Sequence, residues 1–259
     1  MIKLKKLLLE MYDESDFDDE YESDVESDVE SDDIIDSDVI KHANLKGYKI
    51  GPVYHGTNAP KFNKFKTGIK TARVILFTSF EFENGGFFFT EKKNEAKQYG
   101  KNIIPCFLKL SNQLPTFDQI PKNINNANKH ALNILPDLNY IFDPIIERAE
   151  GEDGSDCVDL FITKKCVSSW QKEDGMNILQ FLGSYGKYDW SVFDNVDVCK
   201  RISERGYDYA RCWEDSGDDS YFVTNPSSIK LTDTVTYDDN NNPIPLEKRF
   251  DVNSDDIRY

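Results

Sequence analysis

Three short motifs, far apart in the sequence, hold residue types from which a ligand site could be built. They are VYHGT at residues 53–57, GFFFT at residues 86–90 with Tyr99 behind it, and SYFVTNPSSIK at residues 220–230. A glycine lets a ligand approach the main chain closely, and an aromatic ring offers a face for stacking and cation–π contact. A histidine adds a hydrogen-bonding side chain. No single motif is specific alone, so their order and spacing decide the chemistry.

Several other kinds of site have no matching pattern in this chain. The five cysteines form no CxxC pair and there are only three histidines, so we expect neither a zinc site nor a disulfide framework. The sequence also lacks a P-loop, a Rossmann glycine motif, GxSxG and HExxH. We therefore predict no metal in the site.

In their order and spacing, the three motifs resemble the NAD-binding signature of ADP-ribosyltransferases. The closest subgroup is the diphtheria-toxin/PARP-like (H-Y-E type) branch, in the form seen in phage polyvalent proteins. That pattern has a tyrosine ten residues beyond the aromatic strand, and Tyr99 stands ten residues after Phe89. The RGYD run at residues 205–208 resembles an element that precedes the last strand in phage-type relatives. The resemblance covers roughly residues 50–232 and implies two small packed β-sheets with flanking helices around an NAD cleft.

The resemblance also implies a role for each matching residue, with NAD as a substrate. His55 would hydrogen-bond the adenosine ribose, and Gly56 would offer its backbone groups to the nicotinamide carboxamide. Thr57 completes this motif. Phe88 would form one wall of the nicotinamide pocket, and Tyr99 would stack on the nicotinamide ring.

The third motif departs from the family at the residue that carries the chemistry. Positive charge develops on the ribose when the nicotinamide bond breaks, and the family places a glutamate beside it. Ser220 stands at that position, and a serine can hydrogen-bond but supplies no charge. Asp219 would replace the glutamate only if a bulge re-aimed it, because successive strand residues face opposite sides. The predicted catalytic residues are therefore His55, Asp219 and Ser220.

Short strands and a few helices are expected to position these residues. Aromatic and β-branched runs predict strands at residues 51–54, 74–78, 86–90, 103–110, 207–212 and 221–224. Helices are predicted at residues 92–99, 123–135, 177–185 and 192–204. Thr90 would cap the first of these helices and Gly100 would stop it, while Pro136 would end the second. Because no regular βαβ alternation is present, the predicted class is α+β.

Charge divides the chain into unequal parts. Residues 13–38 hold fifteen of the 47 acidic residues and no Lys or Arg, so the remainder of the −16 chain is close to neutral. We predict an acidic, disordered segment at residues 1–45, a transferase-like domain at 46–233 with an insertion at about 111–190, and a polar, irregular tail at 234–259. The acidic balance disfavours non-specific nucleic-acid binding by the whole chain.

The predicted function is an NAD-dependent mono-ADP-ribosyltransferase that releases nicotinamide and modifies a protein or nucleic-acid acceptor, or that hydrolyses NAD. Ser220 and Phe88 motivate an alternative, a module that binds NAD or ADP-ribose, or only a protein partner, without turnover. A virion-associated structural protein that retains the fold is a further alternative, which suits the acidic segment. No stretch is long enough to span a membrane, and the cysteine usage indicates a reducing compartment. We expect a cytoplasmic location, in the host if the protein is viral.

Overall fold

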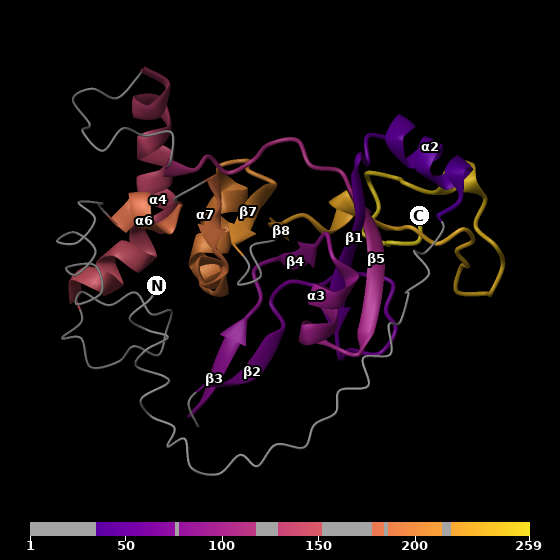
Figure 1. The fold of residues 1–259 in the computed structure, drawn as a ribbon, viewed down its shortest axis with the longest axis horizontal. Coiled ribbons are helices and arrows are strands. Elements are labelled where there is room, and N and C mark those ends of the chain that lie inside the picture. Colours follow the sequence, from indigo (N-terminus) through magenta and orange to yellow (C-terminus); the bar gives the residue numbers. More distant parts are fainter. Residues whose placement is uncertain (1–34, 76–77, 118–128, 152–177, 184–185, 214–218) are drawn as a thin grey trace, which may run out of the picture. The chain divides into compact units, whose positions relative to one another are not determined.

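A seven-stranded sheet positions most of the predicted site residues (Figure 1). The computed structural model describes residues 35–75, 78–117, 129–151, 178–183, 186–213 and 219–259. The strands, in sheet order, are β6 (Tyr188–Asp189), β7 (Tyr209–Trp213), β8 (Asp219–Val223), β4 (Phe87–Thr90), β1 (Ile50–Thr57), β5 (Asn102–Leu108) and β9 (Ile229–Leu231). Neighbouring strands are antiparallel except for β6 and β7, which are parallel.

The helices and a separate hairpin complete the described secondary structure. The hairpin pairs β2 (Lys70–Ile75) with β3 (Thr78–Glu83), so the strand predicted at residues 74–78 is instead the end of one strand and the start of the next. The helices are α2 (Ser37–Leu45), α3 (Lys93–Tyr99), α4 (Lys129–Gly151), α6 (Ile178–Leu182) and α7 (Val196–Glu204), with 3-10 turns η4 (Trp190–Asp194), η5 (Pro226–Ser228) and η6 (Leu246–Lys248). The predicted α+β class is confirmed.

The sheet is narrow where β1 meets β4. Tyr54 and Thr90 are the registered pair between these strands, whereas β1 pairs with β5 from Ile50 to Thr57. The structure therefore shows one sheet joined at a single pair, in place of the two separate small sheets that we expected.

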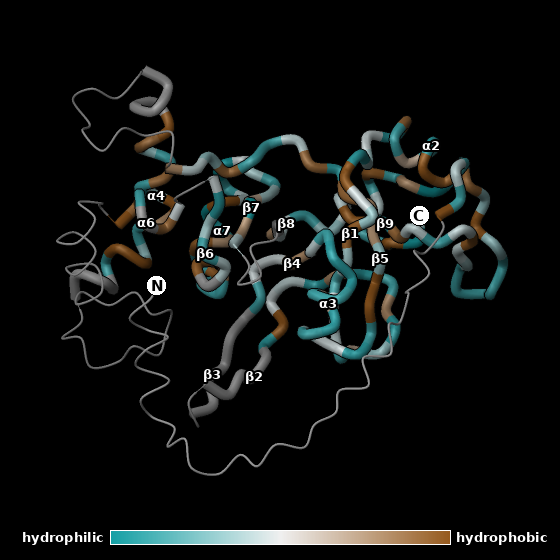
Figure 2. The backbone as a smooth tube through the Cα atoms, viewed as in Figure 1, coloured by the Kyte–Doolittle hydropathy of each residue, from teal (hydrophilic) through white to brown (hydrophobic). Residues whose placement is uncertain are grey.

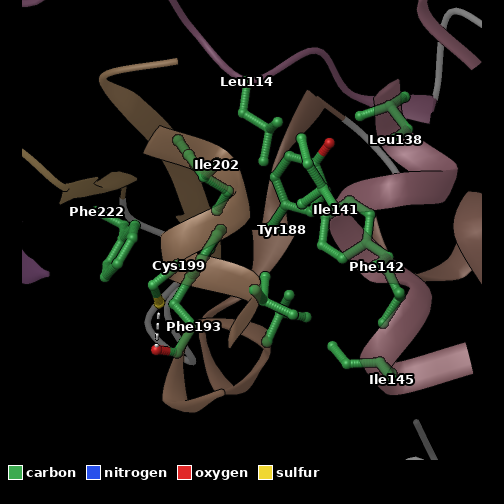
Figure 3. Packing of buried hydrophobic residues seen from close by; sticks show 14 of the residues in the cluster. Leu114, Leu138, Ile141, Phe142, Ile145, Tyr188, Phe193, Cys199, Ile202 and Phe222 are labelled. Carbon is green, nitrogen blue, oxygen red and sulfur yellow. Dashed lines mark hydrogen bonds between the residues drawn. The ribbon is translucent and has the colours of Figure 1, made fainter. Parts of the chain in front are cut away.

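Apolar residues pack against both faces of the sheet. Figure 3 shows the larger cluster, in which α4, α7 and η4 contribute side chains that pack with Phe222 of β8. A second cluster contains Val53, Phe65 and Phe89 together with residues of β5 and β9. Phe88 packs against the first cluster, while its neighbours Phe87 and Phe89 belong to the second. This alternation is what a strand buried on both faces requires.

The helix predicted to end before Pro136 does not end there. α4 runs through Pro136 and Pro144 to Gly151, and residues 123–128 of the predicted helix lie outside the described residues. One face of α4 buries four apolar side chains at helical spacing, Leu138, Ile141, Phe142 and Ile145. Together these four side chains contribute about 6–12 kcal/mol of burial, against about 6 kcal/mol for the two internal prolines. Within the described ranges, no helix has the length and apolar character needed to cross a bilayer.

The two regions predicted to flank the domain contribute to its packing. The compact unit begins at Ile35, upstream of the predicted boundary at residue 46. α2 begins behind the cap Asp36, and its Val39 and Ala43 pack with Phe107 and Phe250. Residues 1–34, with most of the predicted acidic segment, lie outside the described residues.

The C-terminal segment has little regular structure, as predicted, but it is not a loose tail. Phe250 and Ile257 are each only 1% exposed. The buried Arg249 guanidinium donates to the carbonyl oxygens of Thr234 and Leu231 at 3.1 and 3.2 Å. The polar composition of this segment concealed these few anchoring residues, since each is isolated among Asp and Asn.

Candidate functional site

His55 follows Tyr54, the β1 residue that pairs with Thr90 of β4. Its Nδ1 lies 2.9 Å from the carbonyl oxygen of Phe88. A carbonyl only accepts, so Nδ1 carries the proton and donates it. In the neutral ring this leaves Nε2 as an acceptor. The tautomer of His55 is thus set by the backbone of the second motif.

Aromatic rings surround the imidazole. The ring of Phe65 meets it edge-on with a centroid separation of 5.0 Å, and the ring of Phe89 lies 5.5 Å away. Burial among these groups lowers the pKa of His55, and the hydrogen bond to Phe88 opposes that change only in part. His55 is therefore neutral near pH 7, with Nε2 able to accept from a hydroxyl.

Gly56 is required by the packing of α3 on β1. A Cβ atom at Gly56 would lie 1.8 Å from the carbonyl oxygen of Ala96 and 3.2 Å from Cβ of Tyr99. A Cβ atom at Gly100 would lie 2.1 Å from the carbonyl carbon of Thr57. In the structure the helix lies close to Gly56, and the approach of a ligand to its backbone groups stays a prediction. The two glycines bring α3 directly against the strand that carries His55 (Figure 1).

α3 presents Tyr99 at its C-terminal end. The helix begins at Lys93 with Lys92 as its N-cap, and the predicted cap, Thr90, instead accepts a hydrogen bond from the Lys92 amide at 3.3 Å. The predicted stop at Gly100 is confirmed. The Tyr99 side chain is 57% exposed, and α3 is hydrophilic where the neighbouring β5 is hydrophobic (Figure 2). Tyr99 is thus an exposed aromatic residue whose Cβ lies close to the Gly56 main chain.

The side chains of Thr57 and Phe88 are engaged in contacts within the protein. The hydroxyl of Thr57 accepts from the Ala59 amide at 3.1 Å, which ties it into a local turn. The Phe88 ring packs 5.1 Å from Phe222 and 6.4 Å from Phe193. Phe88 is half-buried, so only part of its ring is left to form a pocket wall.

Ser220 lies in a buried row across the sheet. It pairs with Thr90 on one side and Cys212 on the other, and Thr90 pairs in turn with Tyr54. Ser220 is 1% exposed, and its two partners are buried as well. The position where the resemblance places a glutamate is therefore a closed one that accommodates a small side chain.

The backbone register of β8 is regular from Asp219 onward. β8 pairs with β7 without a register shift from Asp219 to Val223, so the bulge that would re-aim Asp219 is not found. The Asp219 side chain lies outside the described residues.

The comparison with protein families decides the fold family. The chain matches ADP-ribosyltransferases in polyvalent proteins over residues 49–236, which is more than half of its length. The chain belongs to this ADP-ribosyltransferase family. The comparisons with curated proteins and with solved structures gave no match. The family named from the three motifs is thus confirmed, together with its α+β fold.

The RGYD element has a structural role in this ADP-ribosyltransferase domain. The Asp208 carboxylate accepts from the Ser111 amide at 2.9 Å, the Ser111 hydroxyl at 2.7 Å and the Asn112 amide at 2.8 Å. These bonds join the start of β7 to the segment that follows β5.

Two residues near the ADP-ribosyltransferase site were not among those predicted. Phe65 packs on His55, and its signal was the pair of phenylalanines at positions 62 and 65 after the first motif. Glu91 accepts from the hydroxyl of Tyr221 at 2.7 Å. Burial and this carboxylate raise the pKa of Tyr221 to about 12. Because Tyr221 faces away from Ser220 in β8, this bond holds Glu91 away from the Ser220 position.

Proposed function

We propose that the chain is an NAD-dependent mono-ADP-ribosyltransferase, with NAD as its substrate. The observation that carries the proposal is the neutral His55 imidazole, whose Nδ1 donates to the Phe88 carbonyl. Its Nε2 is an acceptor for a ribose hydroxyl. The acceptor of ADP-ribose is a protein, a nucleic acid or water, and the reaction takes place in the cytoplasm, in that of the host if the protein is viral.

The reaction requires a firmly held dinucleotide. The bond between the nicotinamide nitrogen and ribose C1′ breaks, and its electron pair leaves with nicotinamide. The acceptor then forms the new bond to C1′ and loses its proton. Tyr99 would stack on the nicotinamide ring, Gly56 would offer backbone groups to the carboxamide, and Phe88 and Thr57 would complete the pocket. Fixing the reactants in this way supplies much of the rate enhancement.

A second candidate is NAD binding without turnover. The observation that favours it is the burial of Ser220 together with the regular register of β8, which lacks the bulge needed to re-aim Asp219. Under this proposal the His55 half of the site still binds NAD, and no side chain stabilises the developing charge on the ribose. Interaction with a protein partner would then be the biological output.

Nicotinamide release, detected by mass spectrometry in a host-cell lysate, distinguishes the candidates. We expect the wild type to release nicotinamide and His55→Ala to release none. His42→Ala is the matched control, because His42 lies in α2 and outside the site. Asp219→Ala tests whether that acid takes part. Equal release by the wild type and His55→Ala would contradict the transferase proposal. An NAD-dependent thermal shift that His55→Ala abolishes, without release, would identify the second candidate.

A further inference from the structure

Phe65 stands at the centre of the aromatic group around His55. Its ring lies 5.0 Å from His55, 4.9 Å from Phe87 and 5.6 Å from Phe89. Phe87 and Phe89 are fixed by the pairing of β4 with β8. Phe65 instead comes from the connection between β1 and β2, and it is nevertheless only 5% exposed. Something other than strand pairing must therefore hold Phe65 against the imidazole.

The C-terminal segment holds that connection in place. The Ile257 amide donates to the Asn63 carbonyl at 2.9 Å, and the Leu231 amide donates to the Ile257 carbonyl at 2.9 Å. The Ile257 side chain is buried in the same cluster as Phe65. Residue 257 therefore bridges the sheet edge at β9 to the loop that carries Phe65. An isolated antiparallel β-bridge between the backbones of Lys64 and Asp256 adds to this contact.

The buried side chain of Lys230 anchors the C-terminal segment. Its side chain is 1% exposed, and Nζ donates to the carbonyl oxygens of Ser254 at 2.7 Å and Asp256 at 2.9 Å. A lysine is seldom fully buried unless its charge is compensated. Burial lowers the pKa of Lys230 to about 8, and the neighbouring carboxylates of Asp251, Asp256 and Asp255 oppose this change. Lys230 thus remains a charged donor near pH 7.

We propose that Phe65 is a positioning residue for His55, and that residues 254–257, held by Lys230, form a clasp that keeps Phe65 in place. Contact with the ring edge restricts rotation of the imidazole, so that Nδ1 stays directed at the Phe88 carbonyl. The consequence for NAD binding rests on the function proposed above, whereas the effect on the imidazole does not. The clasp lies beyond the family match, which ends at residue 236, and it adds to the site a part that the three motifs do not include.

Side-chain NMR of the ligand-free full chain tests this directly, because there are only three histidines. In the wild type we expect His55 to show the Nδ1-protonated neutral tautomer and a pKa below the ordinary value of about 6.5. Phe65→Leu and Lys230→Met should each raise the pKa of His55 and introduce the second tautomer. Phe142→Leu is the control, since Phe142 is fully buried in the other cluster. It should lower stability without altering the His55 signals.

The result that would overturn the proposal is a Phe65→Leu variant whose His55 tautomer and pKa equal those of the wild type. An effect of Phe142→Leu as large as that of Phe65→Leu would also overturn it, because the response would then follow from general loosening. If Lys230→Met does not fold, Ile257→Val probes the same clasp by a smaller change. NAD titration is the second part of the experiment. Phe65→Leu should raise the Kd for NAD about tenfold, which corresponds to the loss of roughly one well-oriented hydrogen bond. If the wild type does not bind NAD, the proposed function is contradicted, whereas the NMR result on the His55 imidazole is unaffected.

Discussion

The two halves of the candidate site differ in what they offer a ligand. The half formed by β1 and α3 presents a half-buried histidine of fixed tautomer and a tyrosine that is 57% exposed. The half formed by β4, β8 and β7 presents Ser220 within a row of buried side chains and 1% exposed. The first half retains the family pattern and includes an exposed tyrosine, whereas the second departs from it and is buried.

This difference gives the Ser220 departure a physical meaning. A glutamate at position 220 would carry a charge into a place where its neighbours Thr90 and Cys212 are also buried. Burial of an unpaired carboxylate is costly, and a serine avoids that cost. If the chain binds NAD without turnover, this difference is a separation between a half of the site that binds and a half that no longer reacts. Four substitutions or changes of condition test that separation.

The largest effect is expected when the family glutamate is restored. Ser220→Glu should lower the free energy of unfolding by about 4 kcal/mol, since it buries an uncompensated charge. Denaturant unfolding measures the change. Ser203→Glu is the matched control, because Ser203 is exposed on α7 and should change stability by about 0.5 kcal/mol or less. A Ser220→Glu protein that is as stable as the wild type and gains nicotinamide release would show that the second half is open.

The next effect concerns the contact that builds the first half. Gly56→Ala places a Cβ atom 1.8 Å from the Ala96 carbonyl oxygen, so α3 must move away from β1 at a cost of about 3 kcal/mol. We expect the Gly56→Ala variant to lose NAD binding as well. Gly206→Ala makes the same change at a position with φ of 77° and no atom within 4 Å, where only the left-handed backbone costs about 1 kcal/mol. Equal losses of stability in the two variants would refute the tight packing of α3.

A smaller effect is expected at Tyr99, and on binding alone. Because its side chain is largely exposed, Tyr99→Ala should change the free energy of unfolding by about 0.5 kcal/mol or less. Loss of the stacking ring should raise the Kd for NAD about fivefold to tenfold. Tyr237→Ala, which removes another exposed ring, should leave Kd unchanged. Fluorescence titration with NAD measures the Kd of both variants. A Tyr99→Ala protein with wild-type affinity would show that Tyr99 is not part of the site.

The smallest effect is the pH dependence of stability that His55 contributes. The pKa of His55 is lowered in the folded protein, so the unfolded chain takes up the proton first as pH falls below about 6.5. The free energy of unfolding should therefore decrease from about pH 6.5 until the pH falls through the folded-state pKa, and not change further below it. His55→Gln should remove this contribution. Unfolding curves between about pH 7.5 and 5 would show it, and identical pH profiles for the two proteins would contradict the neutral state assigned to His55.

Local sequence patterns predicted the elements that carry the motifs. The aromatic run at residues 86–90 and the glycine at position 100 marked β4 and the end of α3 because strand propensity and helix termination are local effects. α4 could not be bounded in this way, since the penalty at Pro136 is local while the burial of Leu138 and Phe142 depends on distant partners. Lys230 illustrates the same limit, because a buried lysine is recognisable only once the carbonyl groups around it are known.

The candidate site was predicted in part for a related reason. Motif order pointed to His55, Gly56 and Tyr99, and the structure places Tyr99 of α3 close to Gly56 of β1, while the roles of all three stay predictions. Spacing could not show that Ser220 is buried, since burial depends on the strands at either side of β8. It also could not reveal Phe65 as a neighbour of His55, because that contact depends on residues 254–257 at the other end of the chain.

Isothermal titration of NAD into the full-length protein and into His55→Ala tests the central claim most directly. The claim is that the half of the site on β1 and α3 binds NAD. We predict a single-site isotherm for the wild type and an affinity at least about tenfold weaker for His55→Ala. Equal affinities for the two proteins, or no binding by the wild type, would contradict it.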